Sequence, residues 1–287
     1  MKWRNRRRSS NVEDRRGSTI SRGAKGGGIG LIALALIGMY FGVDPRIIMG
    51  IGSQLSGGGE ATTTQRANYK PSPKGQQLGE FVSVVLADSE DTWHAIFKQM
   101  GRRYQEPKLV LFTDRVQSAC GMAEAAMGPF YCPGDAKVYV DLGFYDELKR
   151  RHNAPGDFAQ AYVVAHEVGH HVQNLLGISS KVQNARSRMS QAQGNELSVR
   201  LELQADCFAG LWAQHTQQTK QVLEQGDVEE ALNAASAIGD DRLQKQARGY
   251  ASPESFTHGT SRQRVKWFKQ GMQASSINDC DTFSVRL

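Results

Sequence analysis

The chain has 287 residues, of which 39% are hydrophobic and 22% charged, so it can bury a core and form one large domain or two small ones. Its net charge of +6 does not indicate nucleic-acid binding, because the excess lies in the first 27 residues, which hold nine Lys or Arg against two acidic residues. The rest of the chain is close to neutral. We therefore expect no nucleic-acid partner.

An uncharged stretch of 18 residues, Gly26–Val43, follows the basic residues. As a helix it would span roughly 27 Å, close to the thickness of a bilayer's hydrocarbon core. A cleaved signal peptide is the alternative, but no small-x-small cleavage site follows, which favours an uncleaved anchor. The positive-inside rule then predicts a single-pass inner-membrane protein: residues 1–27 form a cytoplasmic tail, residues 28–44 cross the lipid bilayer, and the rest is periplasmic or otherwise extracytoplasmic.

The remaining chain divides into a linker and one folded domain. Residues 45–77 are rich in Gly, Ser, Thr and Pro, which is typical of a flexible tether. From Leu78 the spacing of apolar residues predicts a helix, followed by strands at "PKLVLFTD" and at Lys137–Leu142. The second strand is either an edge that pairs with an extended peptide or an ordinary sheet strand. After it the chain looks helical almost to its end, so residues 78–287 are expected to form a helix-rich α+β domain with a small sheet.

The stretch "APGDFAQAYVVAHEVGHHVQNLLG" carries polar residues inside an apolar helix. Asp157 followed by Gln160 resembles a capping box, and Gly177 can end the helix, so we expect a helix over Phe158–Leu176. Helical phasing places the valines and alanines on one face. The opposite face holds His166, Glu167 and His170.

Histidines four residues apart on a helix can both bind one zinc ion. Glu167 between His166 and His170 then reaches a water molecule on the metal and acts as the general base. A chance HExxH occurs in roughly one chain of this size in a hundred, and the helical phasing reduces that chance further. The adjacent His171 points away, which favours a packing or outer-shell role over a ligand role.

A zinc hydrolase needs a third protein ligand, and the apolar helix around "LELQADCFAGLWA" offers one. Glu202 and Asp206 are four residues apart, so they share a face, and two buried carboxylates need a reason to be there. We expect Glu202 to bind the metal and Asp206 to accept the free ring N–H of a ligating histidine. Glu196 is the competing carboxylate, but its place near the helix start is explained by the helix dipole.

At this point a family resemblance becomes specific. The chain resembles the neutral zinc metallopeptidase family of bacterial single-pass membrane proteins, over roughly residues 75–287 and the anchor. The segments that carry the resemblance are "VVAHEVGHHVQNLLG", "LELQADCFAGLWA", "SACGMAEAAMGPFYCPGDAKVYVD" and "FTHGTSRQR". It implies a zincin-like fold, one zinc ion per chain, and a peptide or protein substrate.

HExxH followed by ExxxD is also similar to the glutamate-zincin peptidases. That similarity implies that Glu202 is the third ligand and Asp206 the outer-shell carboxylate. "THGTSRQRV" resembles the His-Pro…Arg segment of membrane-associated zincins, with Gly259 in place of the proline. By that resemblance His258 stabilises the transition-state oxyanion and Arg264 braces it; a surface histidine is the alternative for His258.

Four cysteines complete the list of candidate residues: Cys120, Cys132, Cys207 and Cys280. An even number in an extracytoplasmic domain indicates disulfides. The local pair Cys120–Cys132 is the easiest to close, which leaves Cys207 with Cys280. Four buried thiols are the alternative.

The sequence therefore predicts a membrane-anchored zinc endopeptidase that acts outside the cytoplasm. Two other classes compete with it. A structural zinc module would use four Cys or His ligands and has no role for Glu167. A non-catalytic, membrane-tethered protein that binds peptides or envelope partners would keep all the residues named above.

Overall fold

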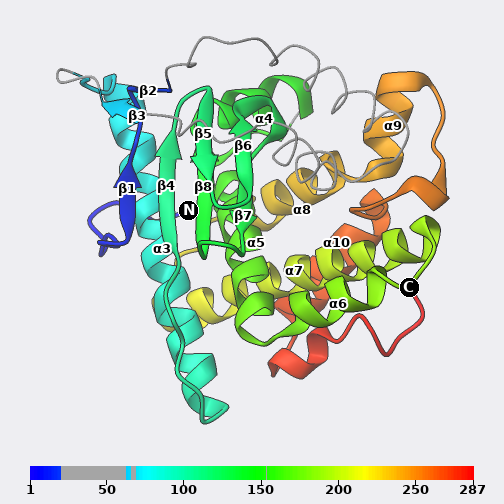
Figure 1. The fold of residues 1–287 in the computed structure, drawn as a ribbon. Coiled ribbons are helices and arrows are strands. Elements are labelled where there is room, and N and C mark those ends of the chain that lie inside the picture. Colours follow the sequence, from blue (N-terminus) through cyan, green and yellow to red (C-terminus); the bar gives the residue numbers. More distant parts are fainter. Residues whose placement is uncertain (21–62, 66–68, 153) are drawn as a thin grey trace.

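The computed structural model of the chain describes residues 1–20, 63–65, 69–152 and 154–287. These residues form a layer of strands beside a larger group of helices (Figure 1). The strands are β1 Val12–Asp14, β2 Ser18–Ile20, β3 Thr63–Gln65, β4 Lys108–Phe112, β5 Arg115–Ser118, β6 Gly121–Glu124, β7 Phe130–Cys132 and β8 Lys137–Asp141. The helices are α3 Pro73–Gln99, α4 Phe144–His152, α5 Asp157–Leu175, α6 Ile178–Arg186, α7 Gln191–Lys220, α8 Asp227–Ala237, α9 Asp240–Arg248 and α10 Ser261–Met272, with 3-10 turns η1 Ala125–Met127, η2 Pro253–Ser255 and η3 Ile277–Cys280.

The main sheet has four strands in the order β1-β4-β8-β7. β1 and β8 pair with β4 in parallel, whereas β7 pairs with β8 antiparallel. Two further antiparallel pairs, β2–β3 and β5–β6, complete the strands of the described residues. The helix-rich α+β class predicted from the sequence is therefore observed.

The two predicted strands are present, as β4 and β8, and both are central. Their apolar runs are buried at nearly every position, as expected for strands that are covered on both faces. The possibility that Lys137–Leu142 is a sheet edge is wrong, because β8 lies between β4 and β7 and its backbone hydrogen bonds are used on both sides. The edges of this sheet are β1 and β7.

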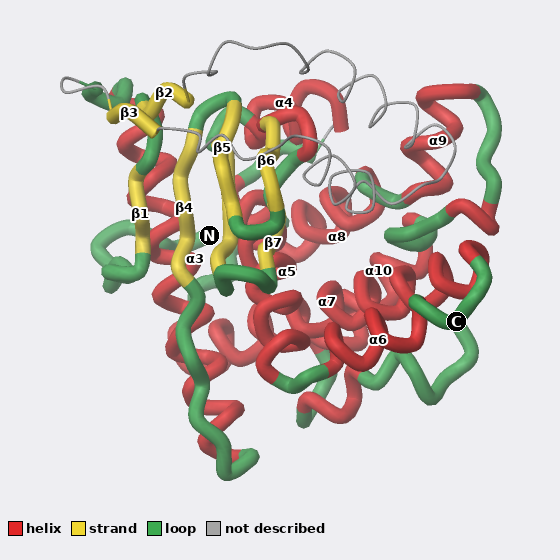
Figure 2. The backbone as a smooth tube through the Cα atoms, in the orientation of Figure 1, coloured by secondary structure: helices red, strands yellow, loops and turns green. Residues whose placement is uncertain are grey.

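The helices pack around α5 and α7, which cross in the middle of the molecule (Figure 2). α3 contacts both of them, and α10 lies along α7. One large apolar core joins α3, the sheet, α5, α7, α8 and α10. Its largest fully buried side chains include Trp93, Phe158, Trp212 and Phe268.

Residues 1–20 are part of this folded unit rather than a separate tail. β1 hydrogen-bonds to β4, pairing Val12 with Leu109. Arg6 Nη2 lies 2.6 Å from Asp88 of α3, and Arg16 Nη1 donates to the carbonyl of Gly75 at 2.7 Å. The expected separation of a basic tail from the domain therefore differs from the structure for these residues.

Two further segments were expected from the sequence, a linker over residues 45–77 and an anchor over residues 28–44. α3 begins at Pro73, where the Ser72 hydroxyl accepts a hydrogen bond from Gly75 N at 3.1 Å, so the last residues of the expected 45–77 linker are helical. The expected anchor, residues 28–44, lies outside the described residues. Within the described residues, no helix combines the length and the apolar character needed to cross a bilayer.

Two disulfides are present, Cys120–Cys132 and Cys207–Cys280, which is the pairing expected from the sequence. The first joins the β5–β6 turn to β7, with Cα atoms 5.8 Å apart. The second joins α7 to η3, with Cα atoms 5.6 Å apart. Both separations lie within the normal range for disulfides.

The pairing of β1 with β4 yields a prediction about topology. A single membrane crossing between residues 20 and 63 would separate β1 from its partner strand, so both parts should lie on the same side of any membrane. Single cysteines in place of the exposed Ser10 and Ser187 should therefore react equally with a membrane-impermeant maleimide in intact cells. Lysed cells provide the control. Labelling of one position and protection of the other would contradict this fold.

Candidate metal centre

Helix α5 begins where the chain passes close to α8. Gly156, which precedes the helix, has φ 118°, and a Cβ there would lie 2.0 Å from the Glu230 carboxylate. That carboxylate accepts the backbone N–H of Phe158 at 3.0 Å. The expected capping box is therefore wrong. Asp157 instead forms an ion pair with the amino group of Met1 at 2.5 Å.

The two-faced character predicted for α5 is observed. Its valines and alanines are buried in the core. His166 and Glu167 are also buried, at 6% and 8% exposure, and the His170 side chain is 16% exposed. α5 ends at Leu175, and Gly177 adopts the left-handed conformation two residues later, close to where the sequence predicts the end.

Helix α7 brings the carboxylates to this face. The helix begins with a capping box in which Ser190 and Gln193 exchange hydrogen bonds. It approaches α5 closely at Gly169, where a Cβ would lie 3.1 Å from the carbonyl oxygen of Ala205. The absent side chain therefore allows Glu202 and Asp206 to reach the histidines.

His166, His170 and Glu202 converge on one point. Each offers one donor atom, and these atoms lie within 4.8 Å of one another. His166 Nε2 lies 3.1 Å from one Glu202 oxygen, and His170 Nε2 lies 3.5 Å from the other. Two imidazoles and one carboxylate suit zinc. Three protein ligands also leave a fourth tetrahedral position for water or substrate.

Asp206 holds the other side of the His166 ring. Its Oδ1 lies 2.9 Å from His166 Nδ1 and accepts the Tyr162 hydroxyl at 2.5 Å. Arg264 binds both oxygens of the same carboxylate, with Nε at 2.8 Å and Nη2 at 2.9 Å. Since Asp206 accepts at Nδ1, the Nε2 lone pair of His166 is directed at the Glu202 side, as a metal ligand requires.

These carboxylates change the protonation of His166. Burial alone would lower the pKa of its imidazole, but Asp206 and then Glu202 raise that pKa to about 9. Burial would raise the pKa of Glu202, yet His170 and His166 hold it well below its usual range. Without metal, a protonated His166 bridges two ionised carboxylates, and a cation at this point would replace its Nε2 proton.

Glu167 lies beside His166 on α5 and is buried. The group formed by His166, His170 and Glu202 does not include it. The role expected from the sequence, in which Glu167 acts on a water molecule rather than on the metal, stays a prediction.

His258 lies in the loop before α10 and is oriented by Asp240. One oxygen of Asp240 accepts the backbone N–H groups of Thr257, His258 and Gly259, at 2.7, 2.6 and 3.1 Å. The other oxygen lies 3.2 Å from His258 Nδ1. Burial lowers the pKa of His258, but Asp240 and Glu202 raise it overall. The ring remains 51% exposed, so a substrate can reach it.

Arg264 does not brace His258, contrary to the expectation. Its guanidinium hydrogen-bonds to Asp206 and Tyr162 instead, and the side chain is only 2% exposed. Arg264 bonds to Asp206 for an electrostatic reason. A buried guanidinium group needs a buried anion beside it, and the Asp206 carboxylate provides one.

Two other candidates lie away from the centre. Glu196 is 63% exposed and pairs with Arg200 one turn along α7 at 3.1 Å. His171 is buried on another side of α5, where its Nε2 donates to the Gln105 carbonyl at 2.6 Å and its Nδ1 lies 3.0 Å from the Tyr131 hydroxyl. His171 therefore connects α5 to β7 and to the chain before β4.

The sequence reasoning missed three residues of this centre. Tyr162 precedes His166 by one helical turn and Gln173 follows His170 by three residues, so helical spacing could have suggested both. Gln173 Oε1 lies 2.9 Å from His170 Nδ1. Asp240 has no local signal, because its partners are about 18 residues away.

The raised pKa of His166 predicts how the stability of the zinc-free protein changes with pH. A histidine whose pKa is raised from 6.5 to about 9 stabilises the fold fully below pH 6.5, and this contribution is lost as the pH rises through 9. Guanidinium unfolding of chelator-treated protein at pH 6.5 and 9 should show a loss of up to about 3 kcal/mol. In His166→Gln the loss should be clearly smaller. Equal losses in both proteins would show that His166 does not carry the effect.

Known proteins resemble this chain over most of its length. The chain is 50% identical over 292 residues to the uncharacterized protein YpfJ of Escherichia coli strain K12, covering 99% of each chain. It is 42% identical over 221 residues to the uncharacterized protein Rv2575 of Mycobacterium tuberculosis strain H37Rv, covering 73% of each. No solved structure matches it. A family model described as putative neutral zinc metallopeptidase matches residues 1–283, and the chain belongs to that family.

Proposed function

We propose that this protein is a zinc-dependent endopeptidase with one zinc ion per chain, held by His166, His170 and Glu202. The observation that carries the proposal is the convergence of these three side chains, with Asp206 already placed on the far nitrogen of His166. Family membership supports zinc chemistry in general. A structural zinc site is less suitable, because the described residues gather three ligands here rather than four.

When bound, zinc supplies Lewis-acid activation of a water molecule and of the substrate carbonyl. Glu167 takes the proton that the attacking water loses and passes it to the leaving nitrogen. His258, fixed through its Nδ1 by Asp240, presents its exposed edge to the oxyanion that develops on the carbonyl oxygen. Asp206 and Arg264 keep the His166 ring in place during these steps.

An extended peptide is the substrate class we favour. β7 is the sheet edge whose Tyr131 hydroxyl contacts both His171 and Asn174 of α5, so this edge runs beside the active-site helix. We propose that a substrate backbone pairs with β7, the free edge strand that contacts this helix, a role that β8 cannot fill.

We place the activity outside the cytoplasm, at a membrane to which residues 28–44 attach the chain. The two disulfides support an oxidising compartment. Because β1 pairs with β4, residues 1–20 lie on the same side as the domain in this proposal. The proposed topology therefore does not include a single membrane crossing that leaves residues 1–20 in the cytoplasm.

Three variants test the proposal. Glu167→Gln should keep zinc and lose cleavage of an unstructured protein substrate by a hundredfold or more, because proton transfer is lost. Glu202→Ala should lose zinc. Glu196→Ala is the matched control on the same helix and should change neither property. Zinc content by mass spectrometry and cleavage rates are the measurements.

Two outcomes would contradict the proposal. If Glu167→Gln cleaved as fast as the parent, the peptidase mechanism would be wrong. If Glu202→Ala retained full zinc, the third ligand would be wrong. A parent that binds zinc tightly but cleaves no peptide would favour the non-catalytic, peptide-binding alternative.

A further inference from the structure

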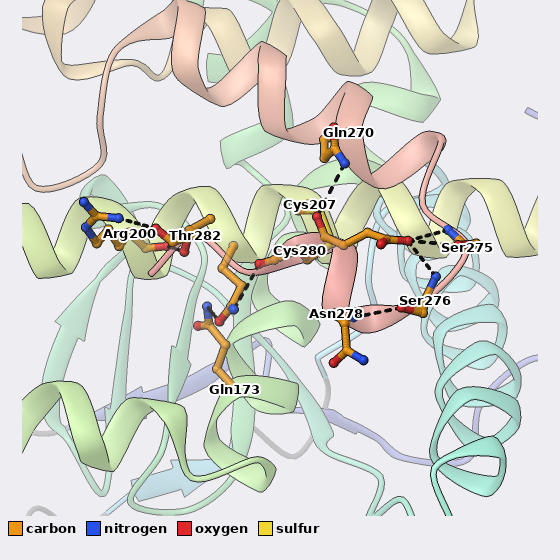
Figure 3. The surroundings of a disulfide bond; sticks show 11 residues. Gln173, Arg200, Cys207, Gln270, Ser275, Ser276, Asn278, Cys280 and Thr282 are labelled. Atoms are coloured by element: carbon orange, nitrogen blue, oxygen red, sulfur yellow. Dashed lines mark hydrogen bonds between the residues drawn. A yellow bond between two sulfur atoms is a disulfide. The ribbon is translucent and has the colours of Figure 1, made fainter. Parts of the chain in front are cut away.

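The chain after α10 is attached to α7 by a disulfide at Cys207, the residue after Asp206. Cys207 and Cys280, joined as a disulfide, are both fully buried (Figure 3). Near them Thr282 donates its hydroxyl to the Arg200 carbonyl at 2.7 Å, and Arg200 donates to the carbonyl of Val285 at 2.9 Å. The disulfide therefore fixes the position of the Cys280 carbonyl against α7.

A chain of buried amide groups leads from that carbonyl to the metal site. Gln204 Nε2 donates to the Cys280 carbonyl at 3.1 Å. Gln204 Oε1 in turn accepts from Gln173 Nε2 at 3.1 Å, and Gln173 Nε2 also donates to the Leu201 carbonyl at 2.7 Å. Gln173 Oε1 then lies 2.9 Å from His170 Nδ1.

The donor-to-acceptor direction of these hydrogen bonds is determined at the Cys280 end. The Cys280 carbonyl can only accept, so Gln204 must turn its NH₂ group toward it and its oxygen toward Gln173. Gln173 must then direct its NH₂ group at Gln204 and Leu201, which leaves its oxygen facing His170. Because that oxygen only accepts, the proton of His170 lies on Nδ1, and the Nε2 lone pair is free for a metal.

The two histidines are thus oriented by different means. His166 is held by the carboxylate of Asp206, which can only accept. His170 is held by a neutral amide, which could equally present its NH₂ group if it turned over. Gln173 and Gln204 are almost completely inaccessible to water, so no solvent molecule replaces a lost partner. The orientation of His170 therefore depends on two carbonyls, that of Leu201 directly and that of Cys280 through Gln204.

We propose that the Cys207–Cys280 disulfide strengthens zinc binding at the site, because it adds, through Gln204 and Gln173, a second constraint on the tautomer of His170 beside that from the Leu201 carbonyl. This rests on the proposed zinc site. Reduction of the S–S bond by a dithiol consumes two electrons and two protons and gives two thiols, while the dithiol becomes a disulfide. The segment around Cys280 then loses its covalent attachment to α7. A chain that folds in a reducing compartment accordingly has a weaker zinc site than one that folds where the disulfide forms.

The full chain, stripped of metal, provides the test, with zinc affinity measured by competition against a chelator of known affinity. Cys207→Ser with Cys280→Ser should lower the affinity by about ten- to a hundredfold, as expected for loss of an outer-shell orientation. Cys120→Ser with Cys132→Ser removes the other disulfide and should stay within about threefold of the parent, since outer-shell orientation is untouched. Gln204→Leu keeps the disulfide and nearly the same volume, and it should also lower the affinity.

A second measurement reports on orientation without zinc. Long-range ¹H–¹⁵N spectra of the zinc-free parent should show His170 protonated on Nδ1, and Gln204→Leu should show a mixture of both tautomers. If the double Cys207/Cys280 variant does not fold, Gln204→Leu carries the test alone. A parent that binds zinc, together with a Gln204→Leu variant of unchanged affinity and tautomer, would overturn the proposal. A parent that binds no zinc would instead overturn the proposed function, and the tautomer measurement would still decide whether the amide chain orients His170.

Discussion

The structure of the centre depends on one buried carboxylate, Asp206, which is completely inaccessible to solvent. An unpaired carboxylate at this depth would be prohibitively costly, and four hydrogen bonds from three side chains compensate it: Tyr162 and His166 of α5 and Arg264 of α10. Each partner is itself polar and buried. Removing any one of them leaves part of the buried Asp206 carboxylate without a partner, so the three helices are held in one arrangement and the direction of the His166 ring is part of it.

Such contacts require helices that approach more closely than side chains normally permit. At Gly169 the backbone of α7 comes within reach of α5. Between α7 and α10 the approach is closer still: a Cβ on Gly210 would lie 2.1 Å from the Phe268 carbonyl oxygen, and one on Gly271 would lie 1.9 Å from the Cys207 carbonyl oxygen. Because these glycines have no side chain, α7 and α10 can approach closely although they are distant in sequence. The buried Arg264 and the buried Asp206 thus come within hydrogen-bond distance.

The part of the site that the sequence could predict is the part encoded by helical spacing. His166, Glu167 and His170 share a face of one helix, as do Glu202 and Asp206 of another, because residues three and four apart on a helix are neighbours. What spacing does not encode is which remote element meets that face. The family resemblance gives Arg264 the wrong partner, and spacing gives no sign of Asp240, although its carboxylate organises the loop around His258.

The N-terminal basic residues and the buried carboxylates of α3 are a second case of charges that need partners. Charges inside an apolar helix need partners, and this argument led from α7 to the metal centre. α3 presents a related pattern, since Asp88 and Glu90 are both about 2% exposed. Burial raises the pKa of Asp88, and the ammonium group of Lys220 and the guanidinium group of Arg6 oppose that shift. Glu90 is paired with Arg7 at 2.9 Å. Arg6 and Arg7, two of the basic residues that suggested a cytoplasmic tail, are thus counter-ions for the core-facing carboxylates of α3, and local charge density alone could not distinguish the two roles.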